Sequence, residues 1–511
     1  MLGLLIGGLG VCVGIAALNP PLLLLALLAG FGAGLVLIIG GGTAIAALLG
    51  TPQITANGLL VVDSPGGFFL FILAIVGGTV LINLWGDLQN RRASGESPRR
   101  VSLHLCFTFA FLQAMILSIS TQNMGIIWVA VEGTTLISAM LIGFDTHRAA
   151  LEAAWKYVVL CTVALACSLF GLILLLHASQ LAHVEGTLDV LALTNAAPHM
   201  PVPLLKLAFV MILIGFAAKA GFAPLHSWLP DAYSQAPAPT SALLSGVLFN
   251  SSLLALLRME PIMEAAGLGG FFHETMIIFG LLSLLIAALF LLVQQDIMRM
   301  LAYSSIENIG LITLGFGLGS PLAVFAALLH ALGHSLSKAL AFLSAGELVH
   351  FFHSHEMNRM IGVMKRIPIG GGGFTVAIMA LGGMPPFPLF ISELLLISAA
   401  FSLNQYIVGV MILGGCSVAF CGLLYHSCRI ILGEDAIHHH HIKDEAHDHP
   451  HEQETAIIDV VNDAHVAIGR EWRHLALYML TTFLILFPVI LFPPFSGILD
   501  TVVMSISGGL R

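Results

Sequence analysis

Long apolar runs separated by short polar links form the dominant pattern of this chain. Each run has about twenty residues, which is the length that an α-helix needs to cross the hydrocarbon core of a bilayer. The pattern predicts about fourteen such spans, centred near residues 10, 31, 76, 111, 134, 165, 213, 248, 284, 308, 335, 385, 419 and 483. The first run lacks the basic residues of a cleaved signal, so we expect it to span the membrane as well.

Composition agrees with an all-α membrane protein and excludes a soluble one. The chain is 58% hydrophobic and 9% charged, with a mean hydropathy of +0.97, whereas soluble domains have about 25% charged residues. Its net charge of −9 is spread along the sequence, which argues against nucleic-acid binding. The seven cysteines form no CxxC pair and lie in apolar runs. We therefore expect them to pack as small hydrophobic side chains, without disulfides or metal ions.

Basic residues are concentrated in alternate links between the predicted spans. The links near 50–66, 178–203, 318–321 and 403–405 contain none. By the positive-inside rule, this alternation predicts that both termini lie outside the cytoplasm. The residues that define the cytoplasmic side are Arg91, Arg92, Arg99, Arg100, Arg148, Arg299, Arg359, Lys365, Arg366, Lys443, Arg470 and Arg473.

One cytoplasmic link, residues 434–471, is long, polar and rich in histidine, with four in a row from His438 to His441. Such a segment could sense metal ions or buffer protons. The simpler interpretation is that the segment is a solvated, variable loop, and this is what we expect.

Ionisable residues inside the spans are the candidates for function, because burying a charge in a bilayer is costly. Glu132 lies near the middle of its span. Lys219 precedes Gly221 and Pro224, which interrupt the helix within a few residues. Interrupted backbone at membrane depth must be satisfied by protein or water. A lysine beside such a break is therefore expected to be a hydrated transfer site, rather than one half of a structural ion pair.

A second group of candidates lies on one predicted helix. His330, His334 and Lys338 are spaced i, i+4 and i+8, so they share a helix face over about 12 Å. Zinc or haem would need further ligands that the sequence does not nominate, so a stripe of titratable groups for proton transfer fits better. Three further charged residues extend the series, namely Lys156, Glu307 and Glu393.

The two segments KAGFAPLHSWLPDA and GGMPPFPLFISELL each combine a charged residue with a glycine–proline interruption, five spans apart. Corresponding breaks in two halves indicate an inverted repeat. We expect two five-helix repeats running in opposite directions, with Lys219 and Glu393 at equivalent positions. The predicted boundaries are 1–101 for spans one to three, 102–258 and 259–433 for the repeats, 434–471 for the histidine-rich loop and 472–511 for the last span and tail.

Three segments carry a family resemblance. Lys219 with GFAPLHSWLPDAYSQAPAPTSALLSG, the run LLHALGHSLSKALAFL, and Glu132 in its span resemble the antiporter-like subunits of respiratory complex I and their Mrp relatives. Within that superfamily, MGIIWVAVEGTTL, LEAAWKYVVL and YSSIENIG are most similar to the F component of hydrogenase-4. The resemblance covers essentially the whole set of predicted spans.

The resemblance implies a role for each matching position. Glu132 and Lys219 would form the family's glutamate–lysine pair, the stripe at His330, His334 and Lys338 its central relay, and Glu393 its exit-side residue. One position departs from the pattern, because Asn250 stands where many relatives have a lysine. An asparagine can hold a water molecule but cannot carry the proton, so the link between the two halves departs from the family pattern here.

The resemblance also implies that the redox chemistry lies in partner subunits. These would hold iron–sulfur clusters and a nickel–iron or quinone site, while this chain would contain no cofactor and would pump protons without being catalytic itself. Its partners would be other antiporter-like subunits and a peripheral redox arm, in a bacterial or archaeal inner membrane. Two different functions stay open: an Mrp-like cation/proton antiporter subunit, and the membrane partner of an inorganic-carbon uptake complex.

Overall fold

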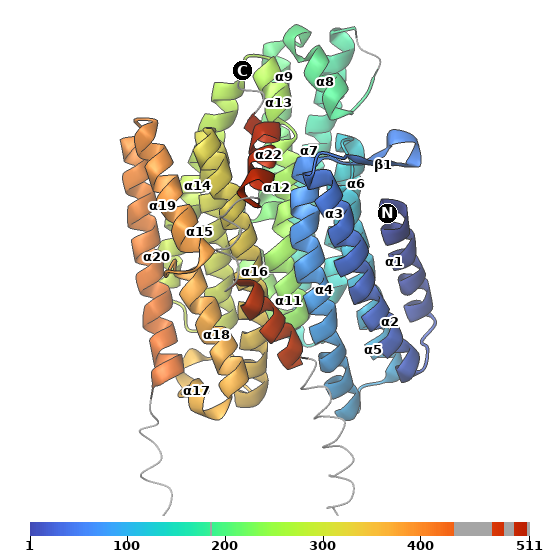
Figure 1. Ribbon diagram of the computed structural model, residues 1–511, viewed down its shortest axis with the longest axis vertical. Coiled ribbons are helices and arrows are strands. Elements are labelled where there is room, and N and C mark those ends of the chain that lie inside the picture. Colours follow the sequence, from blue (N-terminus) through green and yellow to red (C-terminus); the bar gives the residue numbers. More distant parts are fainter. Residues whose placement is uncertain (184–185, 434–472, 485–494, 508–511) are drawn as a thin grey trace, which may run out of the picture.

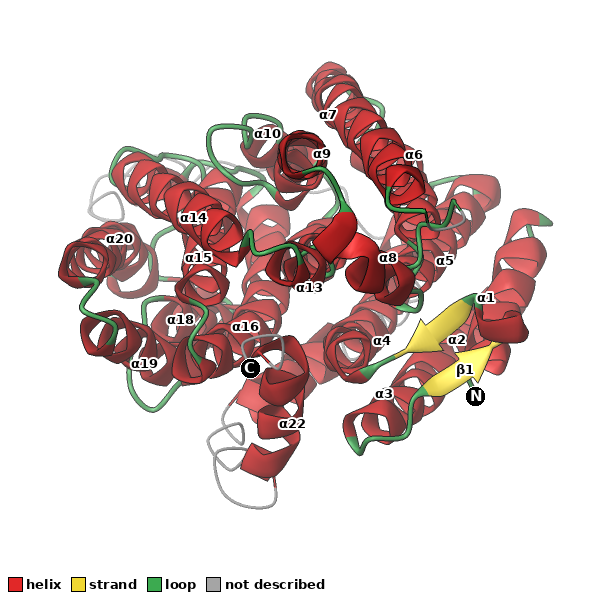
Figure 2. Cartoon of the chain, turned by 90° about the horizontal axis from the view of Figure 1, so that it is seen from above, coloured by secondary structure: helices red, strands yellow, loops and turns green. Residues whose placement is uncertain are grey.

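The computed structural model describes residues 1–183, 186–433, 473–484 and 495–507, and these residues are almost entirely helical (Figures 1 and 2). Ten of the described helices are long and apolar enough to cross a membrane, and three shorter apolar helices accompany them. The chain is therefore a predominantly helical membrane protein, as its apolar pattern predicts. The finer count of about fourteen spans stays a prediction.

The N-terminal helices lie at one edge of the bundle (Figure 2). Their bounds are α1 Leu2–Ala17, α2 Leu22–Gly34, a π-helical stretch Leu35–Gly40, α3 Gly41–Leu48 and α4 Ser64–Ala93. Between α3 and α4, β1 (Gln53–Thr55) and β2 (Leu60–Val62) pair antiparallel, with Gln53 opposite Val62. Helix α4 begins after Asp63, whose carboxylate accepts a hydrogen bond from Gly66 N at 2.9 Å, which is the usual function of an N-cap aspartate.

The next group of helices contains the first break. Its members are α5 Pro98–Ile119, α6 Met124–Ile142, α7 Arg148–Leu181, α8 Val190–Ala196, α9 Val202–Ala220, α10 Leu229–Gln235, α11 Ala238–Leu243, a π-helical turn Leu244–Leu248 and α12 Phe249–Leu257. Side-chain caps begin α6 at Asn123 and α7 at His147. The π-helical turn joins α11 to α12 without interrupting the helical path, and π-turns of this kind are frequent at functional sites.

The last group contains the long, largely buried helix α16. Its members are α13 Glu260–Ala265, α14 Gly269–Leu291, α15 Ile297–Leu318, α16 Pro321–Phe352, α17 Val363–Arg366, α18 Pro368–Leu381, α19 Pro388–Ser402, α20 Tyr406–Leu432 and α22 Phe495–Ser507, and residues 473–484 are also helical. Helix α16 packs against α4, α15, α18 and α19 (Figure 2). Helix α16 therefore lies between α4 of the N-terminal group and the other helices of the last group.

Both predicted breaks are present, and they share a local pattern. Gly221 ends α9 with φ +89°, and Gly383 follows α18 with φ +63°. A proline follows each glycine by three residues, at Pro224 and Pro386, and both prolines follow cis peptide bonds. Only glycine adopts such a positive φ without steric cost, so each interruption depends on its glycine.

The expected equivalence of Lys219 and Glu393 in superposed repeats stays a prediction, and the two residues lie at different sequence distances from the glycines of their breaks. Lys219 precedes its glycine, Gly221, by two residues, whereas Glu393 follows Gly383 by ten. The residue at the matching offset from Gly221 is Asp231. Glu393 nevertheless lies at its break, because a Cβ built on Gly383 would be 2.6 Å from the Glu393 carboxylate.

Most basic residues of the described links lie at one end of the bundle, the lower end in Figure 1, which we call the basic end. This end includes the C-terminus of α4, the N-termini of α5, α7 and α15, and α17. Arg258 and Lys206 are exceptions, since they lie towards the opposite end. The histidine-rich segment 434–471 is outside the described residues. The residues of the basic end are Arg91, Arg92, Arg99, Arg100, Arg148, Arg299, Arg359, Lys365 and Arg366.

Candidate proton-transfer site

Lys219 lies in the last turn of α9 and is only 1% exposed. Its ammonium donates a hydrogen bond to Thr135 Oγ1 at 2.9 Å and another to the hydroxyl of Tyr157. The same ammonium lies 4.7 Å from the centroid of the Tyr157 ring, a favourable cation–π geometry. Two neutral hydroxyls and an aromatic face therefore hold the buried lysine. We call Thr135, Ser138 and Tyr157 the lysine cradle.

The hydrogen bonds within the cradle orient its oxygen atoms towards the lysine. Thr135 Oγ1 donates to the carbonyl of Val131 at 3.2 Å, and Ser138 Oγ donates to the carbonyl of Thr134 at 2.6 Å. Ser138 Oγ then accepts from the Tyr157 hydroxyl, 2.7 Å away. Each hydroxyl hydrogen has a partner elsewhere, so the oxygens of Thr135 and Tyr157 are left as acceptors for Lys219.

Glu132 lies on α6 one turn before Thr135, on the side of the helix that faces the lysine cradle. Its Oε1 accepts a hydrogen bond from Thr162 Oγ1 at 3.1 Å, and its Oε2 is buried with no partner among the described residues. Glu132 and Lys219 are both described, and they form no ion pair with each other, but they are near enough to act on each other electrostatically. The two residues of the predicted pair therefore lie near one another but are not in direct contact.

Lys156 is placed differently from the buried candidates. Its side chain is 45% exposed and pairs with Glu152 at 2.7 Å and with Asp231 at 3.4 Å. Asp231 in turn binds Arg299 Nη1 at 2.9 Å. This cluster connects α7, α10 and α15 at the basic end, and it is the neighbouring Tyr157, not Lys156, that reaches Lys219.

A continuous series of side-chain hydrogen bonds links α15, α16 and α19. Glu307 Oε2 accepts from Asn308 Nδ2 at 2.5 Å, and Asn308 Oδ1 lies 3.0 Å from His330 Nε2. His330 Nδ1 lies 2.8 Å from the hydroxyl of Ser392. Ser392 is the neighbour of Glu393 in sequence. The series therefore extends from Glu307 to the helix that contains Glu393.

The other two members of the predicted stripe are also fully buried in α16. Lys338 Nζ donates to the carbonyl of Leu301 at 2.8 Å. His334 has no hydrogen-bond partner for either ring nitrogen within the described parts of the chain, and its ring meets that of Phe249 edge-on at 5.2 Å. In the same residues, no group of three or more histidine, cysteine or carboxylate side chains is placed to hold a metal ion.

Asn250 connects the two groups of candidates. Its Nδ2 donates at 3.3 Å both to Ser335 Oγ on α16 and to the carbonyl of Gly246 in the π-helical turn. A second bridge lies close by, where the hydroxyls of Ser245 and Ser305 are 2.8 Å apart. The contact between Asn250 and Ser335 places the junction of α12 and α16 directly beside His334.

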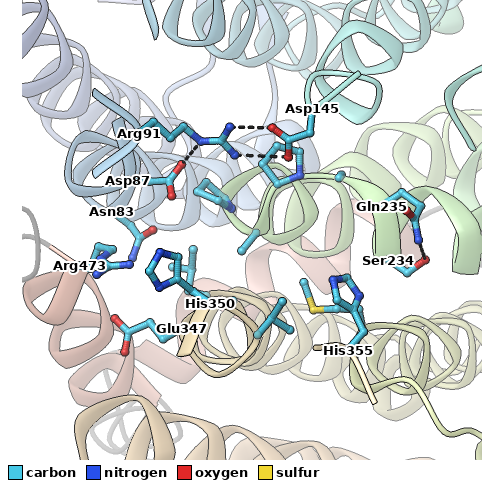
Figure 3. Close-up of a pocket in the computed structure, with 18 of the residues that line it drawn as sticks. Asn83, Asp87, Arg91, Asp145, Ser234, Gln235, Glu347, His350, His355 and Arg473 are labelled. Carbon is cyan, nitrogen blue, oxygen red and sulfur yellow. Dashed lines mark hydrogen bonds and ion pairs between the residues drawn. The ribbon is translucent and has the colours of Figure 1, made fainter. Parts of the chain in front are cut away.

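A polar cavity of about 480 Å³ opens at the basic end (Figure 3). Arg91 lies between Asp87 and Asp145, at 2.9 and 2.7 Å, and Glu347 and His350 lie across the cavity from this cluster, which Arg473 also lines. Gly346 and His350, which line it, continue the i, i+4 series of Lys338 along α16. The cavity therefore approaches the buried stripe from one end.

The contacts that position these charges are mostly made by neutral residues, which the sequence did not single out. Charge inside an apolar run is a visible signal, whereas a buried hydroxyl or amide resembles an ordinary helix residue until its neighbours are known. The partners that sequence reasoning missed are Thr135, Tyr157, Ser138, Asn308, Ser335 and Ser392. The only available signal was a position one turn from a charged residue or next to one in sequence, and Ser138 lacked even that signal.

Comparison with known proteins gives a consistent result. A sequence profile of the family "NADH:quinone oxidoreductase/Mrp antiporter, TM" matches residues 121–420. The chain is 34% identical over 365 residues to the hydrogenase-4 component F homolog of Methylacidiphilum infernorum, covering 69% of this chain and 76% of that protein. It is 30% identical over 353 residues to NADH-quinone oxidoreductase subunit N of Desulforudis audaxviator, covering 68% of each.

Solved structures share the fold over nearly the whole chain. A chain of an archaeal membrane-bound sulfane sulfur reductase matches with a TM-score of 0.75 at 22% identity, covering 100% of this chain and 99% of that one. A chain of the Mrp complex from Dietzia sp. matches with a TM-score of 0.73 at 19% identity, covering 98% of both. These relatives include membrane antiporter-like subunits of several complexes. The protein belongs to the NADH:quinone oxidoreductase/Mrp antiporter family of membrane proteins.

Proposed function

We propose that this chain is the proton-translocating membrane subunit of a redox-driven complex, similar to hydrogenase-4 or NADH-quinone oxidoreductase. The observation that carries the proposal is the set of buried titratable residues on and around α16, of which Glu307 and His330 are linked by hydrogen bonds through Asn308. Such groups are expensive inside a bilayer and mark ion or proton pathways. The proposed relay comprises Glu132, Lys219, Asn250, His334, Lys338, His330, Glu307 and Glu393, with Lys156 at its basic end.

Lys219 is suited to a switching role because its cradle offers two acceptors. An ammonium has three N–H donors, so the third is available for Glu132 or for water at the break. The neutral amine is left with two N–H donors, which the hydroxyls of Thr135 and Tyr157 fully satisfy. We infer that the transferable proton is the third one, delivered when Glu132 approaches and released when it withdraws.

We further propose that the two halves of the path correspond to residues 102–258 and 259–433, which form inverted repeats. The shared pattern of a positive-φ glycine and a following proline supports this division. In the second half, protons would pass along water between Lys338, His330, Glu307 and Glu393, while Asn308 holds His330 beside Glu307. The cavity between Arg91 and His350 would supply water at the basic end, which we assign to the cytoplasmic side, with both termini outside.

The driving chemistry would lie in partner subunits. On this proposal, a peripheral arm with iron–sulfur clusters and a nickel–iron or quinone site oxidises the donor, while neighbouring antiporter-like subunits flank this chain in a bacterial or archaeal inner membrane. The chain itself would hold no cofactor. Purification of the tagged chain from gently solubilised membranes, followed by mass spectrometry, should recover subunits with iron–sulfur motifs. Recovery of a zinc-containing soluble subunit instead would favour a role in inorganic-carbon uptake.

Cation/proton antiport is the second candidate, and the fold similarity to a chain of the Mrp complex favours it over a role in inorganic-carbon uptake. Flux measurements in proteoliposomes that contain the intact complex separate antiport from redox-driven proton pumping. Redox-driven acidification that is unchanged when sodium and potassium are replaced by choline supports proton pumping. Acidification that requires sodium or potassium, with stoichiometric movement of that ion, supports antiport.

A further inference from the structure

A second polar cavity, of about 360 Å³, lies at the end of the bundle opposite the basic end. It is formed where α4 begins, where α5 gives way to α6, and where α12 ends, with α8 and the end of α22 closing its sides. We call it the Glu260 pocket. The lining residues that matter here are Asp63, Gln122, Thr194, Leu254, Arg258 and Glu260.

Among its described lining residues, the pocket has two carboxyl groups, Asp63 and Glu260, but a single basic residue, Arg258. Arg258 pairs with Asp63 through two contacts, at 3.0 and 3.3 Å, and Gln122 donates to the same carboxylate at 3.0 Å. Burial alone would raise the pKa of Asp63, but Arg258, Gly66 N and Gln122 hold that pKa below its usual range. Arg258 and Asp63 therefore neutralise one another and leave Glu260 without a basic partner among the described residues that line the pocket.

Glu260 is a buried carboxyl group that faces this cavity. It is 3% exposed, and its Oε2 has no hydrogen-bond partner in the described chain. A buried carboxyl oxygen without a partner is costly, and water in a polar cavity of this size can supply the missing hydrogen bond, since one water needs only about 10–15 Å³. Glu260 is thus placed to exchange a proton with water in the pocket.

The pocket also reaches towards the junction between the two halves of the path. Asn250, Leu254 and Arg258 are spaced i, i+4 and i+8, so they share one face of α12 and its continuation. Leu254 lines the pocket, and Asn250 lies one turn deeper, about 6 Å further in, with its Oδ1 buried and unpaired among the described residues. A single apolar side chain, 1% exposed, separates the pocket from Asn250 along this face.

We propose that the Glu260 pocket is a second aqueous opening of the path, through which protons at the Asn250 junction reach the face opposite the basic end. Glu260 accepts one proton from water that Asn250 holds at the junction, when this water passes Leu254, and returns the proton to water in the pocket, so that the carboxylate is ready for the next transfer. Leu254 is the dry constriction that prevents a continuous leak. This inference rests on the proposed function, and it adds to that function a release site in the first half of the chain.

Labelling of introduced cysteines tests the opening without any measurement of pumping. The background replaces Cys167, Cys416, Cys421 and Cys428, which are not buried, with alanine. Single cysteines at Thr194, Leu254, Asn250 and Leu253 are then exposed to a charged, membrane-impermeant methanethiosulfonate in vesicles of either orientation that carry the assembled complex. Leu253 is the matched control, because it is buried on the same helix and does not line the pocket.

We expect Thr194→Cys and Leu254→Cys to react, and only from the face opposite the basic end. Leu253→Cys should stay unreactive, and Asn250→Cys should become reactive when Leu254→Ala removes the constriction. The opening is overturned if Leu254→Cys is unreactive from both faces while Thr194→Cys reacts. It is also overturned if Asn250→Cys stays protected in the Leu254→Ala variant.

The role of Glu260 is tested by substitution. Glu260→Gln should slow proton pumping about 100-fold, the lower end of what a positioned acid–base group contributes, while Glu260→Asp retains most of the rate. Glu274→Gln, at an exposed carboxylate near the same end, is the control and should pump normally. Equal rates in Glu260→Gln and Glu274→Gln refute the role. Since labelling does not require pumping, failure of the opening is distinguishable from failure of the proposed function.

Discussion

Removing the two charges of the Glu132–Lys219 pair, singly and together, is the most direct test of the proposed switch. Lys219→Ala removes the ammonium that the lysine cradle holds. Glu132→Gln keeps the shape of the side chain but removes its charge. If Glu132 drives the lysine between two protonation states, the two residues act as one unit, and their losses should not add.

The structure sets the expected size of the glutamate effect. Thr135 holds the ammonium at 2.9 Å, and Glu132 lies one helical turn from Thr135, so we take a separation of roughly 7 Å between the two charges. At an effective dielectric constant near 20, their interaction is worth about 2 kcal/mol. That energy corresponds to about a 30-fold change, so Glu132→Gln should slow pumping by about this factor. Lys219→Ala should abolish pumping, because no proton carrier is left at the break.

Uptake of protons into inverted vesicles, measured with a pH-sensitive dye during turnover of the assembled complex, provides the assay. The double variant should be no worse than Lys219→Ala. Lys206→Ala is the matched control, since Lys206 lies on the same helix but contacts the ring of Phe271 near the opposite end, and it should pump normally. Near-normal pumping in Lys219→Ala would refute the switch. If Lys219→Ala retains a residual rate, a further loss in the double variant equal to the loss in Glu132→Gln would refute the switch as well.

Three further predictions concern other parts of the chain. Deleting Ile437 to Glu452 should leave assembly and pumping within about twofold of normal, because the polar segment can be solvated where it stands; a severe loss in an assembled complex would contradict this. His334→Ala should slow proton transfer more than His334→Lys, because a relay needs a titratable group there, and equal losses with normal assembly would count against the relay. Asp63→Asn should lower the stability of the purified complex by about 3 kcal/mol, since it leaves Arg258 buried without its partner. Because the pKa of Asp63 is lowered in the folded protein, this contribution is present above the unfolded value of about 3.9 and is lost as the pH falls through the folded value. Thermal unfolding of the variant and the parent at pH 7 and at pH 3 measures both effects.

The sequence predicted the membrane fold and the positions of the buried charges because each has a strong local signal. Apolar runs of membrane length predicted the helices, and Gly221 with Pro224 predicted the first break. Charges within apolar runs identified Lys219 and the stripe on α16. None of these inferences needed knowledge of which helices are neighbours.

What the sequence could not predict depends on neighbours. The partner of Lys219 was expected to be Glu132, but the lysine binds Thr135 and Tyr157, which carry no charge and give no signal in an apolar run. Lys156 was placed in the path because it lies in a span, yet its long side chain reaches the surface and pairs with Glu152 and Asp231. Glu393 was matched to Lys219 because both are charges near a break, although their distances in sequence from the two glycines differ.

The neutral cradle gives the lysine a property that an ion pair would not. A direct contact with a carboxylate at about 3 Å would be worth about 5 kcal/mol at the same effective dielectric constant, compared with about 2 kcal/mol at a separation of roughly 7 Å. The difference of about 3 kcal/mol is more than a 100-fold change in the equilibrium between the two arrangements. A lysine in permanent contact with Glu132 would keep its proton, whereas one held by Thr135 and Tyr157 can gain or lose the proton when the carboxylate moves by a few ångströms. In the proposed switch, the hydroxyls hold Lys219 in place while the Glu132 carboxylate approaches and withdraws.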